Sequence, residues 1–184
     1  KDRTETPLTI TAYTNELIQD QQTNSVKDVL LNDPSIRSAV GYGNFQEAYF
    51  VRGQILFSDS VAYNGLYGLL PRQYISSELF ERVEVLRGAS TFLLGSTPSG
   101  DGLGGAINLL PKRAPNEPLA RVTFGTENGE SLNTALDVAH RFGEDKNTGV
   151  RFVAQHKEGG NGVDREDETL DWVMLGWDYR GERF

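Results

Sequence analysis

The sequence predicts an α+β domain of short helices and strands, followed by a run of antiparallel β-strands. Short apolar segments between capping and turn residues fill residues 1–113, and dyad alternation of apolar and polar residues dominates residues 116–184. A proline-rich seam from Pro111 to Pro118 separates these two parts. We therefore expect one domain over residues 1–115 and the start of a second over residues 116–184.

Two short helices are expected near the start of the first domain. Thr14 is a candidate N-cap for a helix over residues 15–22. Ser25 and Asp28 form an aspartate version of the capping box for a second helix, which Asp33-Pro34 ends. The side chains expected to face the core from these helices are Leu17, Ile18, Val26, Val29 and Leu30.

The strands of the first domain are marked by β-branched and aromatic residues. They are expected at residues 8–12, 48–52, 61–64, 82–86 and 106–111. Ser76 and Ser77 could cap a short helix before the fourth strand. Gly88 follows that strand as a turn residue, and one apolar helical turn is expected to end at Gly95.

The second part alternates with a period of two over four segments, so four strands are expected. The residues assigned to their apolar face are Ala120, Val122, Phe124, Leu132, Thr134, Leu136, Val138, His140, Phe142, Val150, Phe152, Ala154, Val173, Leu175, Trp177 and Tyr179. The residues assigned to the polar face include Asp137, Arg141, Arg151, Gln155, Lys157, Asp171 and Asp178. A tight turn is expected at residues 144–149 and a long loop at residues 157–169.

Composition excludes several classes of function. The chain of 184 residues has no cysteine and a net charge of −8, which argues against thiolate chemistry and against binding to nucleic acid. No apolar run is long enough for a transmembrane helix, but membrane β-strands need only about 9–11 residues with one apolar face. The two histidines stand apart without further ligands, so we expect no metal site, no cofactor and no catalytic machinery.

The glycine-rich run Gly100–Gly105 superficially resembles a phosphate-binding loop. Such loops open a helix, whereas Ala106 to Pro111 has the pattern of a strand. We therefore expect a flexible loop at this position and no nucleotide site.

Six segments, in order, resemble the plug domain of TonB-dependent outer-membrane receptors. They are Thr6–Ala12, Ser25–Ile36, Tyr49–Gly53, Tyr63–Leu66, Glu81–Gly88 and the pair Leu94-Gly95 with Gly104–Asn108. The sequence departs from the family pattern at Ser35, Gln54, Asn64 and Ala89. The resemblance implies a mixed-sheet plug inside a transmembrane β-barrel of about 22 strands, of which this chain would hold the first four.

The function implied by the resemblance is import of a ferric siderophore across the outer membrane of a Gram-negative bacterium. Haem, cobalamin or another nutrient is the alternative cargo, and a soluble β-rich binding module is the alternative class. The family presents a TonB box to TonB in the periplasm, and no convincing box stands in Lys1 to Pro7. We expect the chain to be a fragment that begins after this box.

The resemblance also suggests where ligand would bind. The family's ligand-facing plug apices would correspond to residues 39–45, 54–57 and 67–72. Aromatic side chains in loops more often cover a core, but together at the mouth of a barrel they would form an amphipathic surface. The candidate ligand-binding residues are Tyr42, Phe45, Gln54, Phe57, Tyr67 and Arg72.

Five charged residues have two interpretations. They are Arg52, Glu81, Arg82, Glu84 and Arg87. Alternating charges on a strand commonly form its solvated face. Inside a barrel they would need partners, and arginine can pair with wall carboxylates in a bidentate manner. We therefore treat them as candidate latches between plug and barrel.

Overall fold

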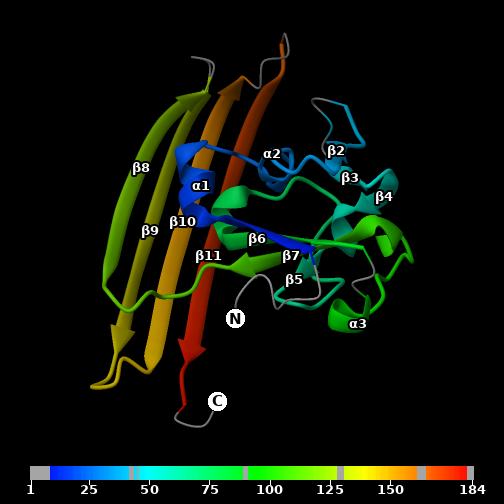
Figure 1. Ribbon diagram of the computed structural model, residues 1–184. Coiled ribbons are helices and arrows are strands. Elements are labelled where there is room, and N and C mark those ends of the chain that lie inside the picture. Colours follow the sequence, from blue (N-terminus) through cyan, green and yellow to red (C-terminus); the bar gives the residue numbers. More distant parts are fainter. Residues whose placement is uncertain are drawn as a thin grey trace. The chain divides into compact units, whose positions relative to one another are not determined.

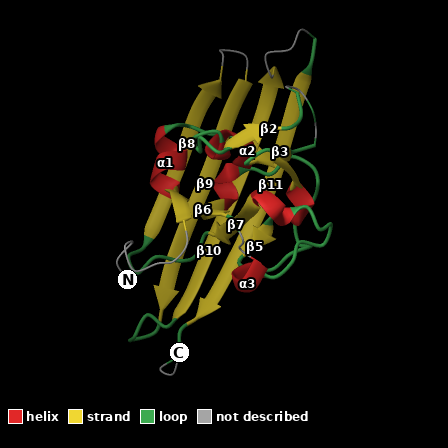
Figure 2. Cartoon of the chain, turned by 45° about the vertical axis from the view of Figure 1, so that its right-hand side comes forward, coloured by secondary structure: helices red, strands yellow, loops and turns green. Residues whose placement is uncertain are grey.

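The chain divides into two compact units, Lys1–Pro111 and Lys112–Phe184. The computed structural model describes residues 9–41, 44, 46–88, 91–127, 131–160 and 165–181. Tyr42 and Phe45, two of the candidate ligand-binding residues, lie outside these described residues. Figures 1 and 2 show short strands and helices in the first unit and long strands in the second.

The first unit contains two small sheets. The strands of the first sheet, in spatial order, are β1 (Thr9–Thr14), β6 (Phe80–Arg87), β7 (Gly105–Pro111) and β5 (Ala62–Tyr63). Strands β5 and β7 run parallel, whereas β1, β6 and β7 pair antiparallel, so the sheet is mixed. The strands of the second sheet are β2 (Ile36–Ser38), β3 (Ala48–Val51) and β4 (Gln54–Phe57). The prediction of a small mixed sheet with short helices is confirmed.

The helices follow the local signals of the sequence. In α2 (Val26–Leu30), Ser25 accepts a hydrogen bond from the Asp28 amide while the Asp28 carboxylate accepts one from the Ser25 amide, as the capping box predicts. In α1 (Asn15–Asp20), Thr14 occupies the N-cap position, but its side chain makes no capping hydrogen bond. The third helix, α3 (Thr91–Leu94), ends before Gly95, whose φ of +79° is the left-handed conformation expected at a helix end.

One hydrophobic core holds the first unit together. It joins the inner faces of α1 and α2 to both sheets, and Phe80, Val83, Val85, Ile107 and Leu109 contribute side chains with no exposed surface. Ile18, Val26, Val29 and Leu30 are buried as predicted. The segment from Ser77 to Leu79 is a 3₁₀ turn, and Ser76 does not cap it through its side chain.

Strands β2 and β4 were not expected from the sequence. Strand β4 forms a hairpin with β3 through the two residues Arg52 and Gly53, whose φ values are +52° and +83°. Two positive φ values are typical of a type I′ turn, where asparagine and glycine are usual. Arginine at the first position concealed this turn. The glycine-rich run ends in a 3₁₀ turn, Gly102–Gly104, and is followed by strand β7, so the strand predicted after the run is present.

The second unit is a four-stranded antiparallel meander. Its strands are β8 (Leu119–Glu127), β9 (Ser131–Phe142), β10 (Thr148–Gly160) and β11 (Asp167–Tyr179), paired in the order β11-β10-β9-β8. The four predicted strands are thus present and lie side by side (Figure 1). The loop predicted at residues 157–169 is shorter, because β10 continues to Gly160 and β11 begins at Asp167. No helix in the described part of the chain is long and apolar enough to cross a membrane.

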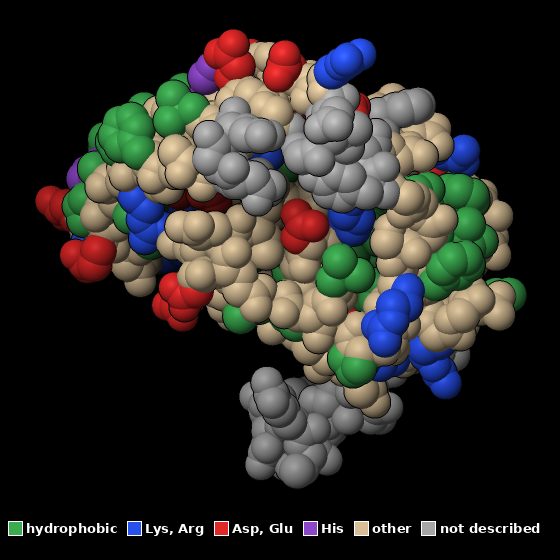
Figure 3. All heavy atoms as spheres, turned by 90° about the horizontal axis from the view of Figure 1, so that it is seen from above, with side chains coloured by type: hydrophobic (Ala, Val, Ile, Leu, Met, Phe, Trp, Pro, Cys, Tyr) green, Lys and Arg blue, Asp and Glu red, His purple; other side chains and the backbone are tan. Residues whose placement is uncertain are grey.

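The polarity of this second sheet is opposite to that of a soluble sheet. Large hydrophobic side chains are exposed, namely Val122, Phe124, Leu132, Leu136, Phe142, Val173, Leu175, Trp177 and Tyr179, whereas Asp137, Arg141, Arg151, Gln155 and Lys157 are buried. Green hydrophobic patches are visible on the surface in the space-filling view (Figure 3). The assignment of Asp171 to the polar face was wrong, because an even spacing from Val173 places it on the exposed face. There its carboxylate bonds His156 Nδ1 at 2.6 Å.

Candidate functional site

Two of the candidate ligand-binding residues, Phe57 and Arg72, meet at one end of strand β4. Arg72 Nε donates to Asp59 Oδ2 at 2.7 Å, and the Arg72 guanidinium carbon lies 4.8 Å from the centre of the Phe57 ring. The Arg72 side chain is 48% exposed and that of Asp59 31%. Phe57, Arg72 and Asp59 therefore present an aromatic ring, a cation and an anion together at a solvent-accessible position. We call Phe57, Asp59 and Arg72 the apical cluster.

Asp101 extends the apical cluster toward Tyr67. Its Oδ2 accepts a hydrogen bond from the Phe57 amide at 3.1 Å, so the loop before β7 is tied to the end of β4. Burial, followed by the charge of Asp101, raises the pKa of the Tyr67 phenol. Asp59 and Asp101 were not anticipated from the sequence, since nothing local to either residue marks it as a partner of β4.

Gln54 does not join this cluster. It pairs with Val51 next to the Arg52-Gly53 turn, at the opposite end of β4 from Phe57. Its side chain is exposed. The backbone of Gly104 lies next to Gln54, since a Cβ atom added to Gly104 would be 3.2 Å from the Cβ atom of Gln54. The turn end of the hairpin is thus a second, separate position on the first unit.

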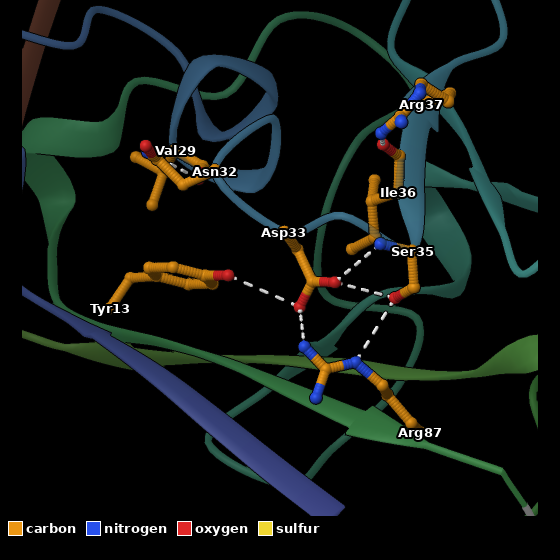
Figure 4. A network of polar contacts seen from close by, with 8 residues as sticks. All are labelled: Tyr13, Val29, Asn32, Asp33, Ser35, Ile36, Arg37 and Arg87. Carbon is orange, nitrogen blue, oxygen red and sulfur yellow. Dashed lines mark hydrogen bonds and ion pairs between the residues drawn. The ribbon is translucent and has the colours of Figure 1, made fainter.

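A buried polar network joins β1, β6 and the segment after α2 (Figure 4). Arg87 Nη2 donates to Asp33 Oδ2 at 2.5 Å, and Arg87 Nε donates to Ser35 Oγ at 3.2 Å. The other carboxylate oxygen of Asp33 accepts from the amide and hydroxyl of Ser35, at 2.9 and 2.6 Å. Tyr13 donates its hydroxyl to Asp33 Oδ2 at 3.3 Å. Asp33 has no exposed surface, so these bonds replace its hydration shell.

The network shifts the pKa of the Asp33 carboxyl group and that of the Tyr13 phenol. Burial alone would raise the pKa of Asp33, but hydrogen bonds from Ser35 and Arg87 and the positive charge of Arg87 outweigh it and lower that pKa. Burial and then the Asp33 charge raise the pKa of the Tyr13 phenol to about 12. At neutral pH the network therefore contains a charged Asp33–Arg87 pair and a neutral tyrosine.

The other candidate latch charges on β6 also have partners inside the first unit. Arg82 Nη2 lies 2.8 Å from Glu84 Oε1, and Glu84 Oε2 accepts from Asn108 Nδ2 at 3.0 Å. Asn108 Oδ1 in turn accepts from the Gly65 amide at 2.9 Å. Arg52 projects from the hairpin turn, with its guanidinium in contact distance of a Cβ placed on Gly88. A role of these residues as latches remains a prediction.

The second unit contains a buried ionic cluster on its polar face. Arg151 binds both carboxylate oxygens of Asp137, at 2.8 and 2.7 Å, and Lys112 Nζ binds Asp137 Oδ2 at 3.2 Å. Arg151 Nη1 also donates to the Arg113 carbonyl at 2.8 Å, and Arg141 Nε donates to the Ala114 carbonyl at 3.0 Å. We call this set the linker anchor, because it binds both side-chain and backbone groups of residues 112–114 to the sheet.

The family model of the TonB-dependent receptor plug domain matches residues 2–101. The chain belongs to this family. The first unit, with its mixed sheet and short helices, is the plug, and the antiparallel strands that follow correspond to the start of the barrel.

Relatives with known ligands are similar along nearly all of this chain. The ferrichrome receptor FcuA of Yersinia enterocolitica is 44% identical over 183 residues, which are all of this chain and 24% of the relative. The vitamin B12 transporter BtuB of Photobacterium profundum is 30% identical over 88% of this chain and 27% of its own length. The crystal structure of BauA, the ferric preacinetobactin receptor of Acinetobacter baumannii, aligns with a TM-score of 0.92 and 36% identity. That alignment covers 99% of this chain and 27% of BauA. The chain thus spans about a quarter of the length of these proteins.

Proposed function

We propose that this chain is the plug and first barrel strands of an outer-membrane receptor that imports a ferric siderophore. The observation that carries the proposal is the similarity to a ferrichrome receptor and to a ferric preacinetobactin receptor over essentially the whole chain. Within that proposal, residues 1–115 gate the pore and residues 116–184 supply its first four strands.

The reversed polarity of the second unit supports a position in the outer membrane. Exposed Val, Leu, Phe and Trp side chains on the strands suit a lipid environment, and buried charges suit the interior of a barrel. Trp177 and Tyr179 are 70% and 60% exposed near the end of β11, where an interfacial aromatic girdle is expected.

The apical cluster is proposed as part of the ligand surface. Siderophore complexes combine polar oxygens with apolar or aromatic parts, and Arg72 stacked on Phe57 offers both kinds of contact. Tyr67 extends this surface, while Gln54 with Tyr42 and Phe45 would contribute from neighbouring apices. TonB is proposed as the periplasmic partner, through a TonB box not evident in this chain.

The candidate latch residues are proposed to hold the closed plug. Arg52, Glu81 and Arg82 are exposed at the surface of the first unit, so they can also reach groups on barrel strands outside this chain. Glu84 and Arg87 are partly buried and would act mainly by holding β6 in place.

An uptake assay tests the proposal. The full-length receptor would be expressed in a Gram-negative host that lacks its own siderophore receptors, and supplied with radioactive iron bound to ferrichrome, pyoverdine or preacinetobactin. We expect uptake of at least one complex, abolished when TonB is deleted. Arg72→Gln should weaken binding of that complex without removing the receptor from the membrane. Absence of uptake for every complex would contradict the proposal.

Cobalamin is the alternative cargo, because a vitamin B12 transporter is among the relatives. The same cells supplied with labelled cyanocobalamin distinguish the two. TonB-dependent uptake of cobalamin without uptake of any ferric siderophore would favour this alternative.

A further inference from the structure

The end of the β3–β4 hairpin carries a buried carboxyl group opposite a buried hydroxyl group. Ala48 pairs with Phe57, and the Ser58 amide donates to the Glu47 carbonyl at 3.2 Å, so Glu47 and Ser58 are the next opposed pair. Opposed residues of an antiparallel pair direct their side chains to the same face of the sheet. That face is the core, because Glu47 is 3% exposed and Ser58 has no exposed surface.

Three oxygens of Glu47, Ser58 and Ser60 have no hydrogen-bond partner among the described residues, and neither has Asp59 Oδ1 between the two serines. Glu47 Oε2 accepts from the Tyr49 hydroxyl at 2.6 Å, but Glu47 Oε1 has no partner. Ser58 Oγ and Ser60 Oγ are also buried without a partner. Buried polar groups in folded proteins are almost always satisfied by protein or by ordered water. The three oxygens therefore indicate a bound molecule or a proton.

The chemistry of these groups favours water over a metal ion. Calcium and magnesium require six or more oxygen ligands and usually several carboxylates. Among the described residues, no group of three or more His, Cys, Asp or Glu side chains could hold a metal ion. An internal water needs two to four polar partners, and serine hydroxyls can both donate and accept. Glu47, Ser58 and Ser60 provide that number.

We propose that Glu47, Ser58 and Ser60 form an internal hydration site of the plug, in which a bound water links the neutral Glu47 carboxyl to the serine hydroxyls. Ionisation of Glu47 then weakens the hairpin end that carries Asp59. This site goes beyond siderophore import, because it requires no ligand and no TonB.

The surroundings of Glu47 make its protonation sensitive to pH near neutrality. Burial raises the pKa of Glu47 to about 7, against the hydrogen bond from Tyr49 and the positive charge of Lys27. The Asp28 charge adds to the rise, and the Ser25 hydroxyl opposes it. In the 3₁₀ turn Ser58–Ser60 that faces Glu47 across the hairpin, Asp59 forms an ion pair with Arg72. Because the pKa of Glu47 in the folded state exceeds its ordinary value of 4.5, folding favours the protonated carboxyl group. The contribution of this group to stability is complete below pH 4.5 and is lost as the pH rises through about 7.

The hydration site and the apical cluster share the same short segment. Asp59, which pairs with Arg72, stands between Ser58 and Ser60 in a 3₁₀ turn. The Glu47 amide also donates to the Arg72 carbonyl at 3.1 Å. A change in the charge of Glu47 is thus transmitted by two direct connections to the residues that form the apical cluster.

Infrared spectroscopy of the full-length receptor in detergent tests the protonation. The carbonyl stretch of a protonated carboxyl group should titrate with a midpoint near pH 7 and disappear in Glu47→Gln. Glu16→Gln, an exposed residue of α1, is the matched control and should leave the band unchanged. A band that survives Glu47→Gln, or a Glu47 that is already ionised at about pH 5, would overturn the proposal.

Hydrogen exchange and crystallography test the coupling and the water. Relative to Glu47→Gln at the same pH, exchange of the Ser58 amide should accelerate about tenfold per pH unit between about pH 5 and 7 and level off above. A crystal structure of the receptor at high resolution should show a water bonded to Glu47 Oε1 and at least one of the serines. A direct hydrogen bond between the Ser58 hydroxyl and the Glu47 carboxyl group, without that water, would refute the hydration site. This test uses the unmodified receptor and so does not depend on whether Glu47→Gln folds.

Discussion

Arg87 and Asp33, which are 54 positions apart in the sequence, form an ion pair of 2.5 Å in which the carboxylate has no exposed surface. This pair connects strand β6 to the segment between α2 and β2. Ser35 bonds to both partners, so the carboxylate and the guanidinium are fixed in one geometry. The pair joins the two sheets of the plug through polar contacts in addition to the hydrophobic core.

Asp33→Asn is expected to destabilise the plug by about 3 kcal/mol, because it leaves the guanidinium without its carboxylate. The loss should be visible as faster hydrogen exchange of the β1 and β6 amides in the full-length receptor. Asp20→Asn, an exposed position at the end of α1, is the control and should change stability by less than about 0.5 kcal/mol. Equal effects of the two substitutions would show that the pair contributes nothing specific.

Tyr13→Phe is expected to remove an alkaline sensitivity of the plug. The pKa of Tyr13 is raised to about 12, so folding favours the neutral phenol, and stability falls as the pH rises from 10 toward 12. Phenylalanine cannot ionise, so the variant should lose less stability over that range than the wild type, after losing about 1 kcal/mol with the bond to Asp33. Denaturant unfolding at two alkaline pH values measures the difference. Tyr74→Phe, which loses a hydrogen bond to a backbone carbonyl, is the comparison.

Local features of the sequence were sufficient for much of the fold. The capping box of Ser25 and Asp28 and the helix end at Gly95 depend on a few adjacent residues, and both are present in the structure. Dyad alternation likewise predicted the four long strands and their apolar face. The error at Asp171 came from miscounting the alternation, because Asp171 stands two positions before Val173 and so lies on the same face.

The polar sites could not be predicted in the same way, because their partners are brought together only by the tertiary fold. Arg87 was recognised as a charge in need of a partner, but nothing local indicates that Asp33 is that partner. Phe57 and Arg72 were expected at apices, whereas Asp59 and Asp101, which connect them to the hairpin and to Tyr67, were not. The positive φ of Arg52 conceals the hairpin in the sequence, since turn rules favour asparagine there.

Gly104→Ala is expected to disrupt the packing of the glycine-rich loop against the β3–β4 hairpin. An added Cβ would lie 2.0 Å from the Val51 carbonyl oxygen, and that oxygen belongs to a paired strand. We expect a loss of about 3 kcal/mol or more, at the upper end for overpacked sites. Gly41→Ala provides the control, because its Cβ would meet nothing within 4 Å in the described part of the chain. Normal stability of Gly104→Ala in denaturant unfolding would mean that the loop can move away without cost.

Arg52→Asn separates backbone strain from a latch function. Asparagine tolerates the positive φ of this turn better than arginine, so the hairpin should gain up to about 1 kcal/mol. If Arg52 holds the plug to the barrel, the same variant should leak small solutes through the pore, measured as sensitivity to antibiotics that the closed receptor excludes. Arg52→Lys keeps the charge and loses the planar fork, and is expected to leak less. A tight pore in Arg52→Asn would argue against a latch at this position.

The linker anchor should keep the end of the plug attached to the barrel strands while the rest of the plug moves. Asp137 accepts three hydrogen bonds, two from Arg151 and one from Lys112, and all three side chains are buried. Asp137→Asn removes the carboxylate charge to which both buried cations bind, which is expected to cost about 3–5 kcal/mol. In the full-length receptor this loss should lower the temperature at which the folded form is converted to the unfolded form during gel electrophoresis in detergent.

Asp145→Asn, in the exposed turn between β9 and β10, is the matched control for Asp137→Asn and should not change that temperature. If the two variants convert at the same temperature, the anchor does not contribute to barrel stability. Cross-linking that shows residues 112–114 released from the strands during transport would contradict its proposed role as a fixed attachment.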